Sequence, residues 1–172
     1  MVKNRIKATI SKNESLQKTT SKFYQKFCSF KGRFNSLPDF LIIGFERCGT
    51  TSLYEYLVQH PQIEPALTKE IHFFDKYYIR GINWYKSCFI SNRKKNNSNG
   101  SLLCGEASPT YILNPKLAER IQKTVPEIKL IILVRNPIDR AFSHYNRALK
   151  LNKETLTFEN AIDQEEIRTK SE

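Results

Sequence analysis

Two unbroken apolar runs, residues 40–43 and 130–134, dominate the pattern of the chain, and both have the length of a strand. The run at residues 40–43, which ends at Gly44, is typical of a strand buried on both faces of a parallel sheet, and residues 130–134 are the clearest strand in the chain. Residues 102–106 are a third strand candidate. Apolar residues three or four positions apart predict helices over residues 50–59, 115–125 and 137–149. This alternation predicts an α/β fold, a phosphate-loop-like parallel sheet flanked by helices, with ligands at the carboxyl ends of the strands.

The other segments have weaker patterns. Residues 65–90 are rich in aromatic residues, which is typical of short helices and core packing around a cleft, whereas residues 91–101 are polar and predict a flexible linker. The pattern of the tail, from Thr157 onward, predicts an amphipathic helix with three apolar residues facing inward, Phe158, Ile162 and Ile167. A helix over residues 11–27 would dock the aromatic rings of the leader, Phe23, Tyr24, Phe27 and Phe30. We therefore expect a leader at residues 1–36, disordered or helical, and an α/β domain at residues 37–172.

Composition supports one domain, because 172 residues with 40% apolar side chains can bury a core. The formal charge is +11, and residues 1–36 contribute +8 of it through nine Lys or Arg against the single acid Glu14. A basic arm of this kind can touch RNA, anionic lipid or an acidic polymer, or it can be a solvated leader without a partner.

Hydropathy and cysteine spacing exclude other classes. No run approaches the roughly 18 apolar residues of a membrane span, and the leader lacks the apolar region of a signal peptide, so we expect a cytoplasmic protein. The four cysteines show neither C-x-x-C pairs nor His partners at metal spacing, which predicts free thiols and no metal site.

A glycine-bearing loop follows the first strand and opens the first helix. Residues 44–51 match the spacing G-x-x-x-x-G-K-[ST], except that Thr50 stands where nucleoside triphosphatases have Lys. Backbone N–H groups at a helix N-terminus can hold a phosphate, with Gly49, Thr50 and Thr51 donating and Arg47 supplying positive charge. Without the Lys we expect no efficient ATP or GTP hydrolysis. A purely structural turn remains an alternative for this loop taken alone.

The surrounding segment, DFLIIGFERCGTTSLYEYLVQHP, resembles the 5′-phosphosulfate-binding loop of sulfotransferases, especially the heparan-sulfate-type and bacterial carbohydrate enzymes. The resemblance implies that this loop binds 3′-phosphoadenosine-5′-phosphosulfate (PAPS) through Arg47, Cys48, Gly49, Thr50, Thr51 and Ser52. It also implies that Arg47 stabilises the leaving phosphate. Many members have Lys at that position. A guanidinium keeps the charge but cannot donate a proton at ordinary pH, so the role we expect is electrostatic.

Residues 69–75, KEIHFFD, resemble the K-E-x-H-F-F-D segment of the same family, in which the Glu is the general base for the acceptor. The resemblance makes Glu70 the base, and sulfuryl transfer needs one because the acceptor loses a proton as it attacks. His72 is a rival base that we rank second, as an orienting or packing residue. A surface ion pair between Glu70 and Lys69 is the plain alternative.

Two further segments, residues 81–85 (GINWY) and 105–111 (GEASPTY), also resemble segments of the family. The resemblance implies that residues 81–85 pack in the wall of the cleft. Heparan-type enzymes often carry a Lys, which helps to bind the acidic sugar, where this chain has Ala107. This departure weakens the case for a heparan-like acceptor.

Residues 130–145 resemble the 3′-phosphate-binding segment of the family, a strand followed by R-[DN]-P-x-x-R-x-x-S. The resemblance implies that Arg135 and Ser143 hold the 3′-phosphate, the group that distinguishes PAPS from ATP. A helix that begins near Pro137 puts Ser143 about two turns from its start. We expect Arg140 to pair with Asp139 or Glu106 instead of the ligand.

These resemblances imply an enzyme that transfers a sulfuryl group from PAPS to a hydroxyl or amine, on a carbohydrate or glycolipid, without a metal or a specific nucleic acid. Two alternatives stay open. One is a nucleotide kinase or NTPase, disfavoured by Thr50 and by Arg135 at the strand end. The other is a non-catalytic nucleic-acid or anionic-polymer binder using residues 1–36. Family members run on for about another hundred residues, so we expect the chain to be C-terminally incomplete. The oligomeric state and the activity of this exact chain stay open.

Overall fold

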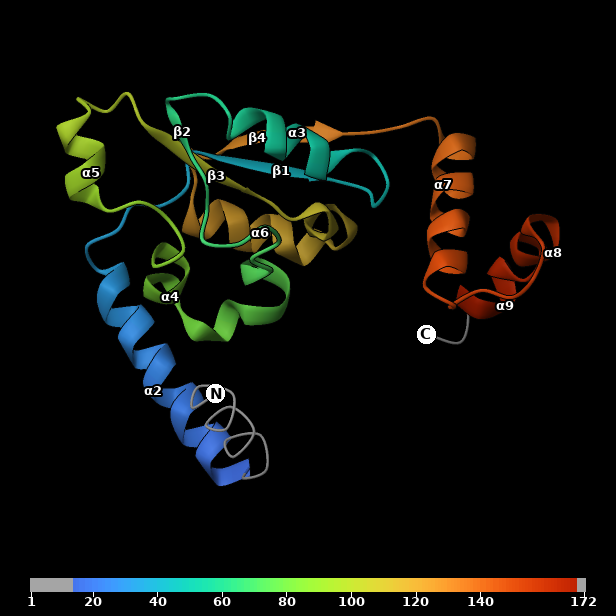
Figure 1. Ribbon diagram of the computed structural model, residues 1–172, viewed down its shortest axis with the longest axis horizontal. Coiled ribbons are helices and arrows are strands. Elements are labelled where there is room, and N and C mark those ends of the chain that lie inside the picture. The colour runs from blue at the N-terminus through green and yellow to red at the C-terminus, as the bar shows by residue number, and fades with distance from the viewer. Residues whose placement is uncertain (1–13, 170–172) are drawn as a thin grey trace, which may run out of the picture.

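The computed structural model describes residues 14–169, which form a four-stranded parallel sheet with helices on both faces (Figure 1). The sheet has the order β2-β3-β1-β4, from β1 (Phe40–Gly44), β2 (Ile63–Glu64), β3 (Leu103–Ala107) and β4 (Lys129–Leu133). In the register of β1, Leu41 lies opposite Glu106 of β3 on one side and Leu130 of β4 on the other. The predicted α/β fold is confirmed.

Strand β1 is buried along its whole length because it has strands on both edges and helices on both faces. Phe40 and Ile42 pack beneath α3 (Thr50–Leu57), whereas Leu41 and Ile43 belong to the larger core on the other face. That core includes residues of α4 (Ile82–Lys86) and α6 (Pro115–Thr124), and Figure 1 shows α3 on one side of the sheet and these two helices on the other. Burial on both faces explains the unbroken apolar run.

Strand β4 confirms the strand predicted at residues 130–134, but its surroundings differ from those of β1. It pairs only with β1 and forms the edge of the described sheet, so Leu130 and Ile132 are exposed. Its run has the composition of a central strand, but burial on both faces is absent here.

The aromatic segment forms three short turns of helix, η1 (Phe73–Tyr77), η2 (Tyr78–Arg80) and α4. Phe73 stacks on Tyr85 with ring centroids 4.3 Å apart and planes 8° apart, and Trp84 is buried beside them. The predicted core packing is therefore confirmed. A further turn, η3 (Pro109–Leu113), leads from β3 to α6 and adds the buried Tyr111 to this core.

The predicted flexible linker at residues 91–101 is instead a short helix, α5 (Asn92–Asn97). The Ser91 hydroxyl accepts from the Lys94 N–H at 3.2 Å and caps its N-terminus. Lys95 Nζ reaches Asp39 Oδ1 at 2.5 Å, so the helix is tied to the start of β1. The polar composition of residues 91–101 does not by itself predict this cap or this ion pair.

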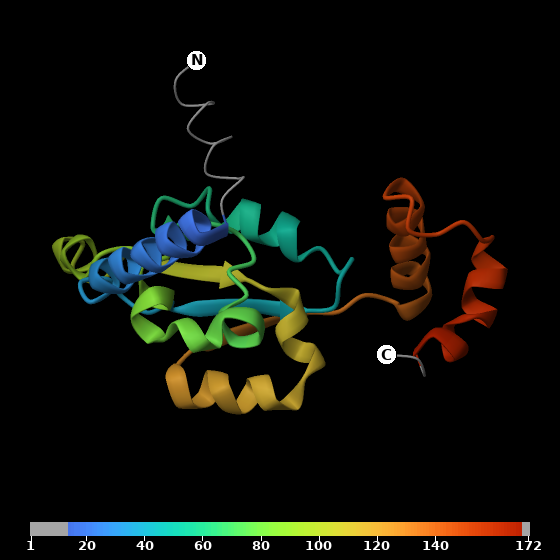
Figure 2. The ribbon, with the colours of Figure 1, turned by 90° about the horizontal axis from the view of Figure 1, so that it is seen from below.

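Three helices, α7 (Pro137–Lys150), α8 (Phe158–Asp163) and α9 (Glu165–Thr169), lie apart from the sheet beyond the carboxyl end of β4 (Figure 2). Phe158 packs inward as predicted, on Phe142 and Tyr145 of α7. The inward positions predicted for Ile162 and Ile167 are wrong, because the tail is two short helices rather than one and both side chains are exposed.

The leader contains helix α2 (Glu14–Gly32), whereas the start of the predicted helix, residues 11–13, lies outside the described residues together with the rest of residues 1–13. The predicted docking of the four leader rings is wrong, since Phe23, Tyr24, Phe27 and Phe30 are all exposed. The side of α2 that is buried carries Cys28, which belongs to the larger core.

Candidate active site

The loop between β1 and α3 leaves the sheet through a glycine that no other residue replaces easily. Gly44 has φ 148°, and a Cβ there would lie 2.3 Å from the carbonyl oxygen of Leu133 in β4. Arg47 and Gly49 also have left-handed backbones, with φ 71° and 91°. These three left-handed positions turn the chain sharply from the strand into the helix.

The loop ends at Gly49, the N-cap of α3, whose carbonyl accepts from the Leu53 N–H at 3.0 Å. The N–H groups of Thr50, Thr51 and Ser52 precede that bond, so they have no acceptor one turn back within the helix. Thr50 is buried, whereas Thr51 and Ser52 are exposed and Cys48 is a half-buried free thiol. The helix dipole and these N–H groups make the loop suitable for an anion.

Two predicted phosphate-binding residues meet between the loop after β1 and the helix after β4. Arg47 Nε donates to Ser143 Oγ at 3.1 Å, although the two residues are 96 positions apart in the chain. An Arg135 terminal nitrogen donates to the Arg47 carbonyl at 3.3 Å. The contact forms because β1 and β4 are parallel neighbours and both segments leave the sheet at the same edge.

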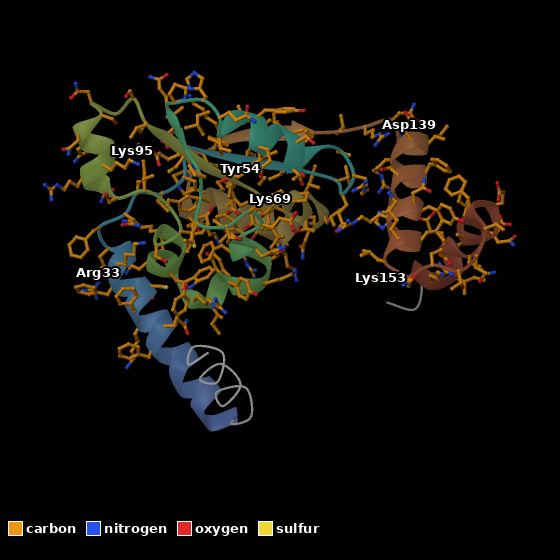
Figure 3. All side chains as sticks on the ribbon, in the orientation of Figure 1. Arg33, Tyr54, Lys69, Lys95, Asp139 and Lys153 are labelled. Carbon is orange, nitrogen blue, oxygen red and sulfur yellow. The ribbon has the colours of Figure 1, made fainter. Side chains whose placement is uncertain are left out.

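A hollow of about 350 Å³ separates the loop from α7, and its walls carry four cations against one carboxylate. Figure 3 labels Asp139, the carboxylate, near the start of α7. The lining residues are Arg47, Arg135, Asp139, Phe142, Ser143, Asn146, Arg147 and Lys150. The balance of charge favours an anionic ligand in this hollow.

Asn146, Arg147 and Lys150 were not predicted to line this hollow. A usable signal was present, since Ser143, Arg147 and Lys150 are spaced four and three positions apart and so share one face of α7. The predicted ligand Ser143 therefore brings two further cations to the same side of the helix.

A second group of predicted residues lies on the segment before η1. Glu70 and His72 both have left-handed backbones, with φ 59° and 54°. Lys69 Nζ lies 2.6 Å from one Glu70 oxygen, and His72 Nε2 lies 3.7 Å from the other. The surface ion pair that competed with the catalytic interpretation is thus present, but it engages one of the two carboxylate oxygens of Glu70.

Asp75, which sequence reasoning left without a role, completes this group. Its Oδ2 lies 2.9 Å from His72 Nδ1 and accepts from the Thr110 hydroxyl at 3.0 Å. Partial burial acts to raise the pKa of Asp75, but the hydrogen bonds from His72, the Lys76 N–H and Thr110 outweigh burial and hold the pKa below its ordinary value. An ionised Asp75 fixes the orientation of the His72 ring.

The fully buried Glu106 anchors the same segment to the sheet. Its Oε1 accepts from Tyr85 at 2.6 Å and from Tyr111 at 3.2 Å, and its Oε2 accepts from Ser108 at 2.7 Å and from the Ile71 N–H at 3.2 Å. Burial raises the pKa of Glu106, and these hydrogen bonds oppose that effect only in part. Since Ile71 stands between Glu70 and His72, Glu106 positions the backbone that carries both.

The structure forms two groups, one around Arg47 and one around Glu70, and in residues 14–169 no hydrogen bond or ion pair joins them. The predicted ion pair of Arg140 with Asp139 or Glu106 does not form in this part of the chain, because Glu106 is already enclosed by its four donors. Nor does any set of three His, Cys, Asp or Glu within these residues have the arrangement of a metal site.

Comparison with known proteins gives consistent matches. Residues 37–169 match a family model described as the sulfotransferase domain. The chain is 37% identical over 162 residues to the membrane-associated sulfotransferase kil1 of Dictyostelium discoideum, covering 91% of this chain and 34% of that protein. It is 38% identical over 112 residues to human heparan sulfate glucosamine 3-O-sulfotransferase 6, covering 65% of this chain and 31% of that protein.

Among solved structures, the crystal structure of a sulfotransferase from Alicyclobacillus acidocaldarius superposes with a TM-score of 0.62 at 35% identity. The match covers 79% of this chain and 60% of that one. The chain thus spans about a third of the length of the two relatives named above and somewhat more than half of the solved structure.

The expected cytoplasmic location is wrong, since a relative that matches 91% of this chain is named as membrane-associated. The expectation rested on hydropathy alone. No helix within residues 14–169 is long and apolar enough to cross a bilayer, but a protein can associate with a membrane without a spanning helix.

Proposed function

Because the chain belongs to the sulfotransferase family of enzymes, we propose that it binds PAPS and transfers the sulfuryl group to an acceptor hydroxyl or amine. The observation that carries this proposal is the contact between Arg47 and Ser143, 3.1 Å long, which joins the loop after β1 to the helix after β4. Each segment on its own could be a structural turn. Their meeting in a hollow with four cations supports a ligand with two separate anionic groups.

The donor would lie with its 5′-phosphosulfate on the loop and its 3′-phosphate near α7. The first group would take the N–H groups of the α3 N-terminus and the charge of Arg47, with the loop residues Cys48, Gly49, Thr50, Thr51 and Ser52 around it. Arg135 and Ser143 would hold the 3′-phosphate. The Ser143 oxygen accepts from Arg47, so its O–H is available to donate to that phosphate.

The chemistry is a displacement at sulfur. The acceptor oxygen or nitrogen attacks the sulfur in line, the bond between sulfur and the bridging phosphate oxygen breaks, and 3′-phosphoadenosine-5′-phosphate (PAP) leaves with the electron pair of that bond. Arg47 and the loop N–H groups stabilise the negative charge on this leaving phosphate. A guanidinium stays protonated at ordinary pH, so Arg47 contributes charge and hydrogen bonds rather than a proton.

Glu70 takes the acceptor proton in this proposal. Its side chain is 41% exposed against 16% for His72, so its carboxylate is the one open to an acceptor. The imidazole of His72, held by Asp75 at Nδ1, would orient Glu70 through its Nε2. Glu106 would act as a positioning residue, because it holds the Ile71 N–H between these two side chains.

A carbohydrate is the acceptor class we propose, and a glycolipid would present the same hydroxyl chemistry. A human relative is named as acting on heparan sulfate glucosamine, which supports a sugar. The fully buried Ala107 stands where many heparan-type members have a Lys, so this position offers no cation to an acidic polymer.

The decisive test is a calorimetric titration with PAP and, separately, with ADP. Both carry two phosphates on an adenosine and differ in where the second one sits. We expect PAP to bind at least about tenfold more tightly, since a charge-assisted pair with the 3′-phosphate contributes about 1.5–3 kcal/mol.

Arg135→Ala should lower the affinity for PAP to that for ADP, while the exposed Arg93 of α5 offers a control, Arg93→Ala, that removes the same charge away from the hollow. Equal affinities for PAP and ADP in the folded protein would refute the proposal. A loss of PAP affinity of the same size in both variants would mean that net charge, rather than a 3′-phosphate site, governs binding.

A further inference from the structure

Helix α2 carries a stripe of aromatic rings that points away from the protein. Phe23, Phe27 and Phe30 are spaced four and three residues apart, so at 100° per residue they share one side of the helix. Phe34 follows in the next turn with its ring 5.7 Å from that of Phe30. These four side chains are 75%, 59%, 60% and 60% exposed. On the described part of the chain these rings therefore form a continuous exposed phenylalanine surface.

The opposite side of α2 is docked firmly, so the helix cannot rotate to bury these rings. Cys28 is buried in the core, and a Cβ on Gly32 would lie 1.7 Å from the Asn83 carbonyl oxygen of α4. Just beyond the helix, Asn35 Nδ2 donates to the Phe89 carbonyl at 2.7 Å. The close approach of α2 and α4 thus holds the stripe outward.

Cations flank the stripe. Lys26 and Arg33, with Ser29 between them, line an open hollow of about 750 Å³ whose apolar wall is Phe23 and Phe30. Gln25 and Asn83 also line it, and none of these described lining residues is acidic. Ammonium, guanidinium and hydroxyl donors beside phenyl rings match the boundary between phosphate headgroups and acyl chains.

We propose that this surface, made of Phe23, Phe27, Phe30, Phe34, Lys26 and Arg33 and called here the α2 face, docks on an anionic phospholipid bilayer. The rings would enter the boundary between headgroups and acyl chains, while Lys26 and Arg33 bind headgroup phosphates. The rest of the chain would stay above the membrane. Figure 3 shows Arg33 at the opposite end of the protein from Asp139, so docking leaves the candidate active site open.

The positive charge of residues 1–36 favours an anionic lipid bilayer over a second copy of the chain as the partner of the α2 face. Residues 1–36 hold nine Lys or Arg and one acid, so pairing of two α2 faces would bring two segments of charge +8 together. An anionic bilayer instead attracts each cation near its surface. Aromatic rings beside cations can also stack on unpaired RNA bases, so RNA is the competing ligand that the test below includes.

Flotation with vesicles tests the proposal on the 172-residue chain. Binding is measured with neutral phosphatidylcholine vesicles and with vesicles containing about 30% phosphatidylserine, which carry a negative surface potential. We expect binding to the anionic vesicles only. Phe23→Ser with Phe27→Ser should lower the partition coefficient by about 100-fold, since apolar side chains lose burial. Lys26→Gln with Arg33→Gln should lower it by about 30-fold, at about fivefold per cation.

Each double variant has a matched control in the chain. Lys116 and Lys123 are exposed on α6 at the same spacing of seven residues, so Lys116→Gln with Lys123→Gln removes the same charge elsewhere. Tyr56 and Ile79 are 69% and 95% exposed, so Tyr56→Ser with Ile79→Ser removes comparable apolar surface. Both controls should bind vesicles within about twofold of the unchanged protein. Ser and Phe have similar helix propensities, and unchanged thermal midpoints verify that α2 is intact.

Three results would overturn the proposal. The first is vesicle binding that the two α2 variants leave unchanged or that the controls weaken equally. The second is a dimer in sedimentation that Phe23→Ser with Phe27→Ser dissociates, because a second copy would then occupy the α2 face. The third is tight binding of an RNA oligonucleotide that both α2 variants abolish while vesicles remain unbound.

Discussion

Replacing Tyr85 by Phe removes a single hydroxyl from the buried cluster around Glu106. Tyr85 and Glu106 are both fully buried, and the hydroxyl donates to Glu106 Oε1 at 2.6 Å. The phenyl ring of the variant keeps the stack on Phe73 and leaves little new space. After the substitution, Oε1 retains only the longer bond from Tyr111, at 3.2 Å.

The cost follows from the charge of the acceptor. A hydrogen bond to an ionised group contributes about 1.5–3 kcal/mol, against about 1 kcal/mol for a neutral pair. We therefore expect Tyr85→Phe to lower the free energy of unfolding by about 2 kcal/mol at a pH where Glu106 is ionised, which corresponds to a fall in Tm of about 4–8 °C for a chain of this size. Burial raises the pKa of Glu106, so the cost should shrink towards about 1 kcal/mol as acid protonates it.

Urea denaturation at several pH values measures this cost, and Tyr54→Phe is the matched control. Tyr54 is also buried, but its hydroxyl accepts from a neutral partner, the Ala66 N–H, at 2.8 Å. Its cost should be about 1 kcal/mol and should not change over the same pH range. A cost for Tyr85→Phe below about 0.5 kcal/mol, or one that follows Tyr54→Phe at every pH, would refute a charged hydrogen-bonded cluster at Glu106.

Three further predictions concern the carboxylates. The pKa of Glu106 is raised in the folded state, so the stability that its protonated form contributes is complete below the unfolded pKa and is lost as pH rises through the folded pKa. In urea titrations, Glu106→Gln should remove this loss of stability at higher pH. An unchanged pH profile of the free energy of unfolding would contradict the raised pKa. The pKa of Asp75 is lowered, so the unchanged protein should be more stable than Asp75→Asn above the ordinary Asp pKa, and this difference should vanish as pH falls through the folded pKa. Urea titrations measure the difference. A difference in stability that persists in acid would count against the pairing of Asp75 with His72. Glu70→Gln should lower kcat for transfer from PAPS by about 10²- to 10⁴-fold while PAP affinity stays within about twofold, and a larger fall in kcat for His72→Asn than for Glu70→Gln would make His72 the base.

Local patterns predicted the elements that carry the site. The apolar run, the glycine turn and the helical periodicity around residues 40–57 identified β1, the loop and α3, because each depends on residues a few positions apart. The same holds for the strand and helix on either side of Arg135. The composition of residues 91–101 misled us, since the Ser91 cap and the ion pair of Lys95 with Asp39 depend on contacts that composition does not report.

Local sequence patterns could not predict the roles of the buried polar residues. Glu106 lies in the short motif at residues 105–111, which also supplies its partners Ser108 and Tyr111. Its other two partners, Ile71 and Tyr85, come from segments 35 and 21 positions earlier in the chain. Asp75 acquires its role only when η3 brings Thr110 beside it. The predicted pairing of Arg140 with Glu106 failed for the same reason, because burial of Glu106 is a property of the assembled core.

The amino-acid sequence by itself determined the strand, loop and helix units and the residue types at their ends, since backbone propensity and periodicity act over one or two turns. Only the tertiary structure decided that β1 and β4 are neighbours, so that Arg47 meets Ser143, and that the rings of α2 face outward while Cys28 and Gly32 face inward. An apolar periodicity predicts that a helix has an apolar face, but it does not predict which surface packs on that face. That choice depends on contacts between segments far apart in the chain, whose free energy no local pattern contains.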